Sequence, residues 1–199
     1  MPLFFGQEKV NVSGQPLSTI HVTPKTSSDK PEESSNVLSI LDYVTVGDGV
    51  IIENGIASNF RSSPKSCLKI PAETYPLEEG KTFRLTFTTG EVINTPNYLE
   101  QIMYYPEMEL YLQNKTIMSY GNGANLTTTA EVNTKYIVDL PIGQKGTIVI
   151  HDADMNVLET AEVTRGPDTF MQEMILGGRE FNGREFYGTI DLNNTGILL

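Results

Sequence analysis

Two glutamates, Glu107 and Glu109, stand two positions apart in the segment PEMELYL. Alternate residues of a β-strand point to the same face, so this spacing places both carboxylates on one side of an expected strand. Two carboxylates that flank a glycosidic bond are the usual groups of glycoside hydrolysis. The same pattern is typical of a solvated strand face, and we expect that role here, with no catalytic residue.

A second acidic cluster, DADMN (residues 152–156), has the Asp-x-Asp-x-Asn spacing that opens a calcium-binding loop. Such a loop then requires a glycine and a bidentate glutamate, where this chain has Val157 and Val163. We therefore expect a tight hairpin turn closed by Asp and Asn hydrogen bonds, and no metal ligands. An irregular calcium site on the rim of the fold is the alternative.

Histidine and cysteine are scarce. The chain has two histidines, His21 and His151, and one cysteine, Cys67. A Ser–His–Asp relay or a multi-histidine metal site cannot be built from one histidine in a terminal segment and one at a strand end. We expect Cys67 to be a buried, unreactive thiol. The sequence thus favours a protein that is not an enzyme and has no cofactor.

Tyrosines give a stronger functional signal, because aromatic faces stack on pyranose rings while Asn and Asp side chains bond the sugar hydroxyls. The segment 120–125, YGNGAN, adds a polar loop, although the chain has no tryptophan. Tyrosine is also common on ordinary strand surfaces. The candidate glycan-binding residues are Tyr104, Tyr105, Tyr111, Tyr120 and Asn122.

Composition excludes some partners. The chain has 25 acidic and 14 basic residues, a formal net charge of −11, which would repel a phosphate backbone. Its N-terminal segment has no apolar run long enough for a signal peptide or a membrane span. We therefore expect no nucleic acid and no membrane among the partners.

The chain divides into three expected parts. Residues 24–36, PKTSSDKPEESSN, have no large apolar side chain and form a polar linker. Residues 1–23 form an N-terminal arm whose few apolar side chains do not offset the entropy of ordering it. We expect the arm to become ordered on a partner's sheet edge or within an oligomer, with a disordered terminus as the alternative. Its attachment residues are Leu3, Phe4, Phe5, Val10, Val12 and Ile20.

Residues 37–199 are expected to form an all-β domain. Turn pairs at Asn54–Gly55 and Asn114–Lys115 separate short strands, and Phe83, Leu85 and Phe87 alternate on one side of another. No long window shows a helical stripe. Evenly spaced strands predict a jelly-roll sandwich of two antiparallel sheets. Three further strands are expected at Tyr136–Leu140, Thr147–His151 and Val157–Val163.

Four segments in order carry a resemblance: IIENGIASNFRSSPKSCLKIP (51–71), TFRLTFTTGE (82–91), NTKYIVDL (133–140) and LGGREFNGREFYGTIDLNNTGI (176–197). Together they resemble the concanavalin A-like, laminin-G-like sandwiches of bacteriophage virion proteins. The resemblance implies that Ile190 and Leu192 point into the core and that the apolar terminus pairs within a sheet. Glucanases of this superfamily need a third carboxylate, where this chain has Leu112.

The arm segment LFFGQEKVNVSG (3–14) is similar to openings of phage structural proteins. The resemblance implies a virion structural protein, a head or tail fibre or a decoration protein, exposed on the particle after synthesis in the bacterial cytoplasm. Its expected partners are other virion proteins of the capsid, neck or tail, copies of itself, with a trimer favoured, and a host surface glycan. The alternatives are a glucanase-like enzyme and a free-standing carbohydrate-binding adhesin module.

Overall fold

The computed structural model describes residues 36–63, 65–91, 99–143, 145–166, 172–178 and 184–199. Within these ranges the chain forms β-strands and no helix. The predicted arm (1–23) and all of the predicted linker (24–36) except Asn36 lie outside the described residues. The expectations for the arm's attachment residues therefore stay predictions.

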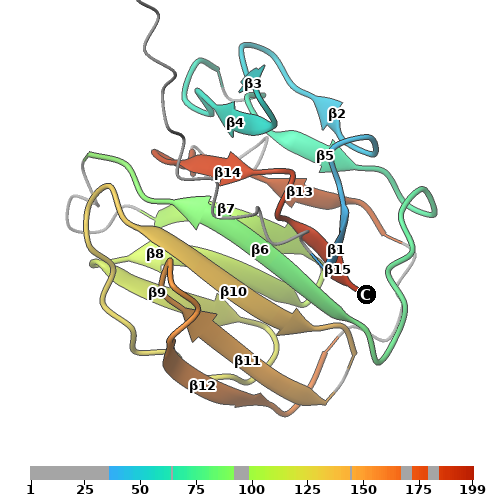
Figure 1. Ribbon diagram of the computed structural model, residues 1–199, viewed down its shortest axis with the longest axis vertical. Coiled ribbons are helices and arrows are strands. Elements are labelled where there is room, and N and C mark those ends of the chain that lie inside the picture. The colour runs from blue at the N-terminus through green and yellow to red at the C-terminus, as the bar shows by residue number, and fades with distance from the viewer. Residues whose placement is uncertain (1–35, 64, 92–98, 144, 167–171, 179–183) are drawn as a thin grey trace, which may run out of the picture. The chain divides into compact units, whose positions relative to one another are not determined.

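The described strands form two antiparallel sheets, with β6, β10, β11 and β12 side by side in front and β7, β8 and β9 behind them in Figure 1. The nine-stranded sheet runs β12-β11-β10-β6-β14-β4-β3, with β15 also paired to β6 and β1 to β15. Its strands are β1 (Val37–Ser39), β3 (Ile51–Glu53), β4 (Ile56–Ser58), β6 (Thr82–Thr88), β10 (Lys135–Pro141), β11 (Gly146–His151), β12 (Val157–Val163), β14 (Thr189–Asp191) and β15 (Gly196–Leu198).

The six-stranded sheet runs β2-β5-β13-β7-β8-β9. Its strands are β2 (Thr45–Val46), β5 (Leu68–Ile70), β7 (Leu99–Tyr105), β8 (Met108–Gln113), β9 (Thr116–Tyr120) and β13 (Met174–Leu176). Each sheet has one face against the other, so the prediction of an all-β sandwich is confirmed.

Two hairpins follow directly from their turn residues. Asn54 and Gly55 join β3 to β4 with φ angles of 52° and 78°, and Asn114 and Lys115 join β8 to β9 with 51° and 62°. Two successive residues with positive φ form the type I′ turn, whose twist matches that of the paired strands. Asn and Gly tolerate this conformation best, so the Asn at the first position of each turn made both turns recognisable from the sequence.

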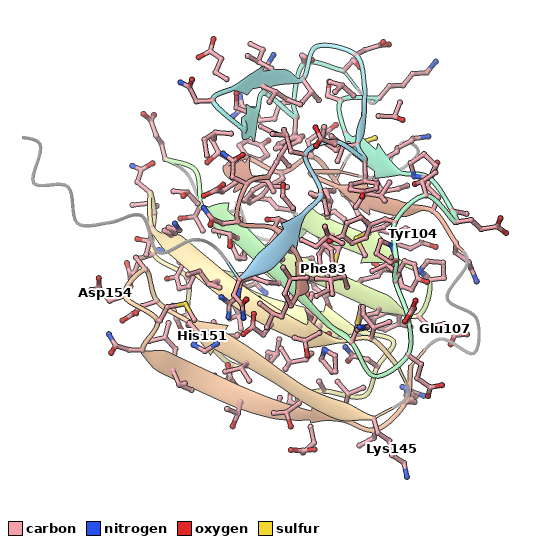
Figure 2. The ribbon with its side chains drawn as sticks, turned by 45° about the vertical axis from the view of Figure 1, so that its right-hand side comes forward. Phe83, Tyr104, Glu107, Lys145, His151 and Asp154 are labelled. Carbon is pink, nitrogen blue, oxygen red and sulfur yellow. The ribbon has the colours of Figure 1, made fainter. Side chains whose placement is uncertain are left out.

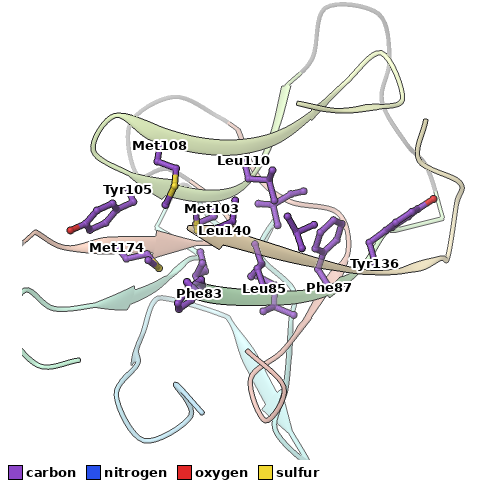
Figure 3. Close-up of a cluster of buried hydrophobic side chains, with 14 of the residues drawn as sticks. Phe83, Leu85, Phe87, Met103, Tyr105, Met108, Leu110, Tyr136, Leu140 and Met174 are labelled. Carbon is purple, nitrogen blue, oxygen red and sulfur yellow. The ribbon is translucent and has the colours of Figure 1, made fainter. Parts of the chain in front are cut away.

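The core lies between the sheets and follows the predicted alternation. Phe83, Leu85 and Phe87 of β6 are fully buried, as are Val138 and Leu140 of the neighbouring β10. Figure 3 shows the β6 side chains in one cluster with side chains from the opposite sheet. The residues contributed by that sheet include Met103, Tyr105, Met108, Leu110 and Met174.

The C-terminal stretch closes the larger sheet. Ile190 and Leu192 are fully buried, as predicted, and β15 pairs with both β1 and β6. The predicted pairing of the apolar terminus is therefore confirmed, with Val37 opposite Leu198. Gly188 is required by close packing, because a Cβ there would collide with the Thr88 carbonyl oxygen.

Candidate functional site

The outer face of the six-stranded sheet carries a row of side chains that cross-strand pairing brings together. Tyr104 of β7 pairs with Glu109 of β8, and Glu109 pairs with Tyr120 of β9. The row continues through Ile175 of β13 to Lys69 of β5. Directly opposed residues of an antiparallel pair have Cβ atoms about 5 Å apart, so neighbours in this row can act on one ligand.

Strand β8 sets which side chains reach this face. Leu110 and Leu112 are fully buried in the core, so Glu109 and Tyr111, which alternate with them, point to the opposite side. Tyr111 is opposite Gln101 of β7, in the register next to the Tyr104–Glu109–Tyr120 row. The strand thus holds a carboxylate and a phenol side by side on its outer face.

A groove of about 380 Å³ opens over these strands. Tyr120 is 66% exposed at its edge, whereas Tyr111 is 8% exposed and forms part of the floor. The groove therefore combines an open aromatic face with a buried phenol. It is lined by Leu99, Glu109, Tyr111, Tyr120 and Arg184.

Arg184 comes from a segment far away in the sequence. Its carbonyl oxygen accepts a hydrogen bond from the Gln101 N–H (3.1 Å), beside a β-bulge in β7. Two residues later the Phe186 N–H donates to the Gly177 carbonyl (3.0 Å), and the Phe186 ring is buried against Phe87. Backbone and core contacts therefore fix where the Arg184 side chain enters the groove.

The two charged groups of the groove form a long ion pair with each other. An Arg184 guanidinium nitrogen lies 3.8 Å from a Glu109 carboxylate oxygen, which is an ion pair but longer than a hydrogen bond. Burial raises the pKa of Tyr111, the Glu109 charge raises it further, and Arg184 acts in the opposite direction. Tyr111 consequently stays a neutral phenol that can donate a hydrogen bond near neutral pH.

The groove offers an aromatic surface for stacking, a carboxylate acceptor, guanidinium donors and a phenol within one small concavity. This combination suits a ligand that has both apolar C–H faces and several hydroxyl groups. Within the described residues, no group of three or more His, Cys, Asp or Glu side chains is placed to hold a metal ion.

Two of the predicted glycan-binding residues do not reach the surface. Tyr105 is 0% exposed and packs in the core, because it pairs with Met108 on the inward face of β7 and β8. Asn122 is also 0% exposed: its side-chain amide donates to Ser119 Oγ (2.7 Å) and its side-chain oxygen accepts from the Ala124 N–H (3.0 Å). Neither can contact a sugar, so the predicted set is corrected at these positions.

The other three predicted residues are on the outer face. Tyr120 lines the groove, whereas Tyr104 is half-buried beside Glu109 and is not among the lining residues. Of the tyrosines considered, Tyr111 also lines the groove. Arg184 and Leu99 were not predicted: no local pattern shows that the Arg184 segment meets these strands, and an apolar residue such as Leu99 of β7 gives no signal of a binding site.

The glutamates Glu107 and Glu109 do not share a strand face. Glu107 lies in the turn that joins β7 to β8, with a φ of 62°, and Glu109 lies on β8. Figure 2 shows Glu107 at the periphery of the sandwich. Since only Glu109 lines the groove, the described residues place no second carboxylate across it.

The DADMN segment forms the predicted hairpin turn between β11 and β12. The Asp152 carboxylate accepts hydrogen bonds from the Asp154 and Asn156 N–H groups (2.9 Å each) and from the Asn156 side chain (2.8 Å). The Asn156 side-chain bond is the main cause of the lowered Asp152 pKa. In Figure 2, Asp154 and His151 lie on the other side of the molecule from Tyr104.

Two further reactive side chains of the described residues, Cys67 and His151, are buried. Cys67, next to β5, is 1% exposed, in agreement with the predicted buried thiol. On the larger sheet, His151 Nε2 lies 3.3 Å from an Asp139 oxygen. The same Asp139 carboxylate accepts two hydrogen bonds from Arg84, at 2.7 and 2.8 Å. This cluster links three strands of the nine-stranded sheet.

A smaller hollow of about 290 Å³ lies beside β14, lined in part by Arg61 and Tyr187. The Arg61 guanidinium carbon sits 4.2 Å from the centre of the Tyr187 ring. Because this cation–π contact covers one face of the ring, that face is closed to a sugar. The hollow is thus a weaker candidate than the groove over β7, β8 and β9.

Comparison with known proteins gives likenesses to solved structures only: no protein family and no curated protein matches the chain. An HCR/D mutant superposes with a TM-score of 0.50 at 11% identity, covering 74% of this chain and 40% of that one. This likeness concerns the fold alone.

Two other structures superpose with lower scores. A protein of unknown function from Shewanella oneidensis MR-1 has a TM-score of 0.46 at 11% identity, covering 78% of this chain and 74% of that chain. A conserved carbohydrate esterase from the Shiga toxin-encoding bacteriophage phi24B has a TM-score of 0.43 at 13% identity, covering 74% of this chain and 86% of that chain.

Among the described residues, no helix is long and apolar enough to cross a membrane.

Proposed function

We propose that this protein is a non-enzymatic bacteriophage virion component that binds a host surface glycan with its β-sandwich. The observation that carries the glycan part is the groove over β7, β8 and β9. There an exposed tyrosine, a carboxylate and a guanidinium surround about 380 Å³.

The groove fits a pyranose ring in size and chemistry. Tyr120 offers an open ring face to the C–H side of the sugar, and its neighbour across the strands, Glu109, offers an acceptor for the hydroxyls. Tyr111 adds a phenol donor and Arg184 adds guanidinium donors among the lining residues. Rigid strands position three of these four side chains, which limits the entropy lost on binding.

The virion part of the proposal has a different basis. It rests on the resemblance of residues 40–199 to concanavalin A-like phage sandwiches and on the polar linker that precedes them. In this proposal the N-terminal arm docks on the capsid, neck or tail. Several copies, with a trimer favoured, then present their grooves together, and multivalency compensates for weak single-site binding.

Glycan binding is tested with the full-length protein on an array of bacterial surface oligosaccharides. We expect binding that falls about tenfold or more in Tyr120→Ala, because the stacking face is lost. The matched control is Leu158→Ala, which removes an exposed apolar side chain from β12 of the other sheet. Equal binding by wild type and Tyr120→Ala would contradict the proposed site.

Attachment is tested by deleting residues 1–23 in the phage that encodes the protein. Because the arm supplies the docking contacts in this proposal, we expect the shortened protein to be absent from purified particles by mass spectrometry. The shortened protein should still bind the glycan that the full chain selects on the array. Incorporation at the wild-type level would contradict attachment through the arm.

A further inference from the structure

The charges that line the groove bear on whether its sugar ligand is neutral or acidic. Arg184 supplies the only positive charge among the described lining residues, and Glu109, 3.8 Å away, carries the opposite charge. We infer that the groove selects a neutral hexopyranose and discriminates against carboxylated or phosphorylated sugars. This inference rests on the proposed glycan-binding function and specifies its ligand class.

The local electrostatics argue against an anionic ligand. A guanidinium recognises carboxylate or phosphate best when its own charge is uncompensated. Here the Glu109 carboxylate reaches the same groove and would lie within a few ångströms of any anion that approached Arg184. Repulsion by Glu109 then offsets much of the attraction by Arg184.

Among the described residues, the lysine of the same cross-strand row is already paired with a carboxylate. Lys69, in the same cross-strand row as Glu109, has its ammonium 3.6 Å from a Glu173 oxygen. The whole chain carries a formal charge of −11, which disfavours the approach of an acidic sugar at long range. An anionic glycan would therefore be disfavoured both on approach and in the groove.

A neutral sugar can form hydrogen bonds with both Arg184 and Glu109. Neighbouring hydroxyls of a hexopyranose can each donate one hydrogen bond and accept another. One hydroxyl can donate to Glu109 while the next accepts from Arg184, so an opposite-charge pair about 4 Å apart matches a vicinal diol. The Tyr111 phenol provides a further donor at the floor, and Tyr120 contacts the ring face.

The test compares oligosaccharide pairs that differ only in a glucose replaced by glucuronate. Wild type should bind the neutral member of each pair more tightly. In Glu109→Gln, which leaves Arg184 uncompensated, the ratio of glucuronate to glucose binding should rise about fivefold at low ionic strength and less at physiological salt. Glu162→Gln, the same charge change at an exposed position of β12, should leave the ratio unchanged.

The outcomes separate the two proposals. Preference of wild type for the glucuronate member, with binding still lost in Tyr120→Ala, would overturn the inference and leave the proposed glycan site standing. An unchanged ratio in Glu109→Gln would also overturn it. Absence of any Tyr120-dependent binding to either member would overturn the proposed function and the inference with it. Thermal unfolding of each variant verifies that the sandwich is intact.

Discussion

Two arginine–carboxylate pairs lie on the outer faces of the two sheets, and they are built differently. Arg84 and Asp139 are opposite each other on β6 and β10 and form two hydrogen bonds of 2.7 and 2.8 Å. Arg184 and Glu109 come from distant segments and approach only to 3.8 Å. The Arg84 and Asp139 side chains are 19% and 13% exposed, and the Arg184 and Glu109 side chains are 33% and 14% exposed, so the two pairs differ in the exposure of the arginine.

The comparison shows that residue type alone does not identify a binding site. In the first pair two guanidinium N–H groups of Arg84 face the two oxygens of the Asp139 carboxylate. His151 Nε2 also lies 3.3 Å from one of these oxygens, so the three side chains interact with one another. In the second pair the two groups are 3.8 Å apart and both line the groove. The first pair therefore stabilises the sheet, and the second is the pair that we propose contacts a ligand.

The largest expected effect is a difference between the two pairs in how much each contributes to the free energy of unfolding. Asp139→Ala leaves the Arg84 guanidinium, whose side chain is only 19% exposed, without its carboxylate and should lower the free energy of unfolding by about 3 kcal/mol. Glu109→Ala should lower it by less than about 1 kcal/mol, because the Arg184 side chain is 33% exposed and lies 3.8 Å away. Urea unfolding of both variants measures the difference. Equal losses in both would contradict the contrast between a structural pair and a ligand-binding pair.

A third carboxylate sharpens the comparison, because it also accepts hydrogen bonds from groups within the fold. Glu159 of β12 accepts hydrogen bonds from the N–H and hydroxyl groups of Thr127 and Thr128, at 2.5 to 3.0 Å. Burial acts to raise the Glu159 pKa, but these hydrogen bonds outweigh it and the pKa is lowered. The carboxylate thereby ties the edge of one sheet to a loop that closes the edge of the other.

The lowered pKa gives a pH-dependent prediction of smaller size. A depressed folded-state pKa contributes stability above the unfolded value, about 4.3 for Glu, and this is lost as the pH falls through the folded value. Glu159→Gln should cost about 1.5 kcal/mol near neutral pH, and the difference from wild type should vanish in acid. Unfolding curves over a pH series measure this. A difference that grew in acid would contradict the assignment.

Much of the fold could be predicted because its signals are local. The turns at Asn54–Gly55 and Asn114–Lys115 need residues that tolerate positive φ, and these are visible in the sequence. The alternation of Phe83, Leu85 and Phe87 likewise marks the inward face of β6. Each of these features depends on neighbouring residues alone.

The site was predicted only in part because it depends on register and on distant contacts. Tyr104 and Tyr105 are adjacent, so one must face outward and the other inward, and the bulge after Gln101 sets which. Asn122 has a side chain that could bind a sugar, but its amide groups form hydrogen bonds with Ser119 and Ala124 instead. Arg184 joins the groove through a contact that no local pattern encodes.

The most direct test of the central claim is a crystal structure of the full-length protein with the oligosaccharide selected on the array. The account predicts a pyranose ring stacked on Tyr120, with hydroxyls hydrogen-bonded to Glu109 and Arg184. A sugar bound elsewhere on the sandwich, with the groove over β7, β8 and β9 free of ligand, would contradict it.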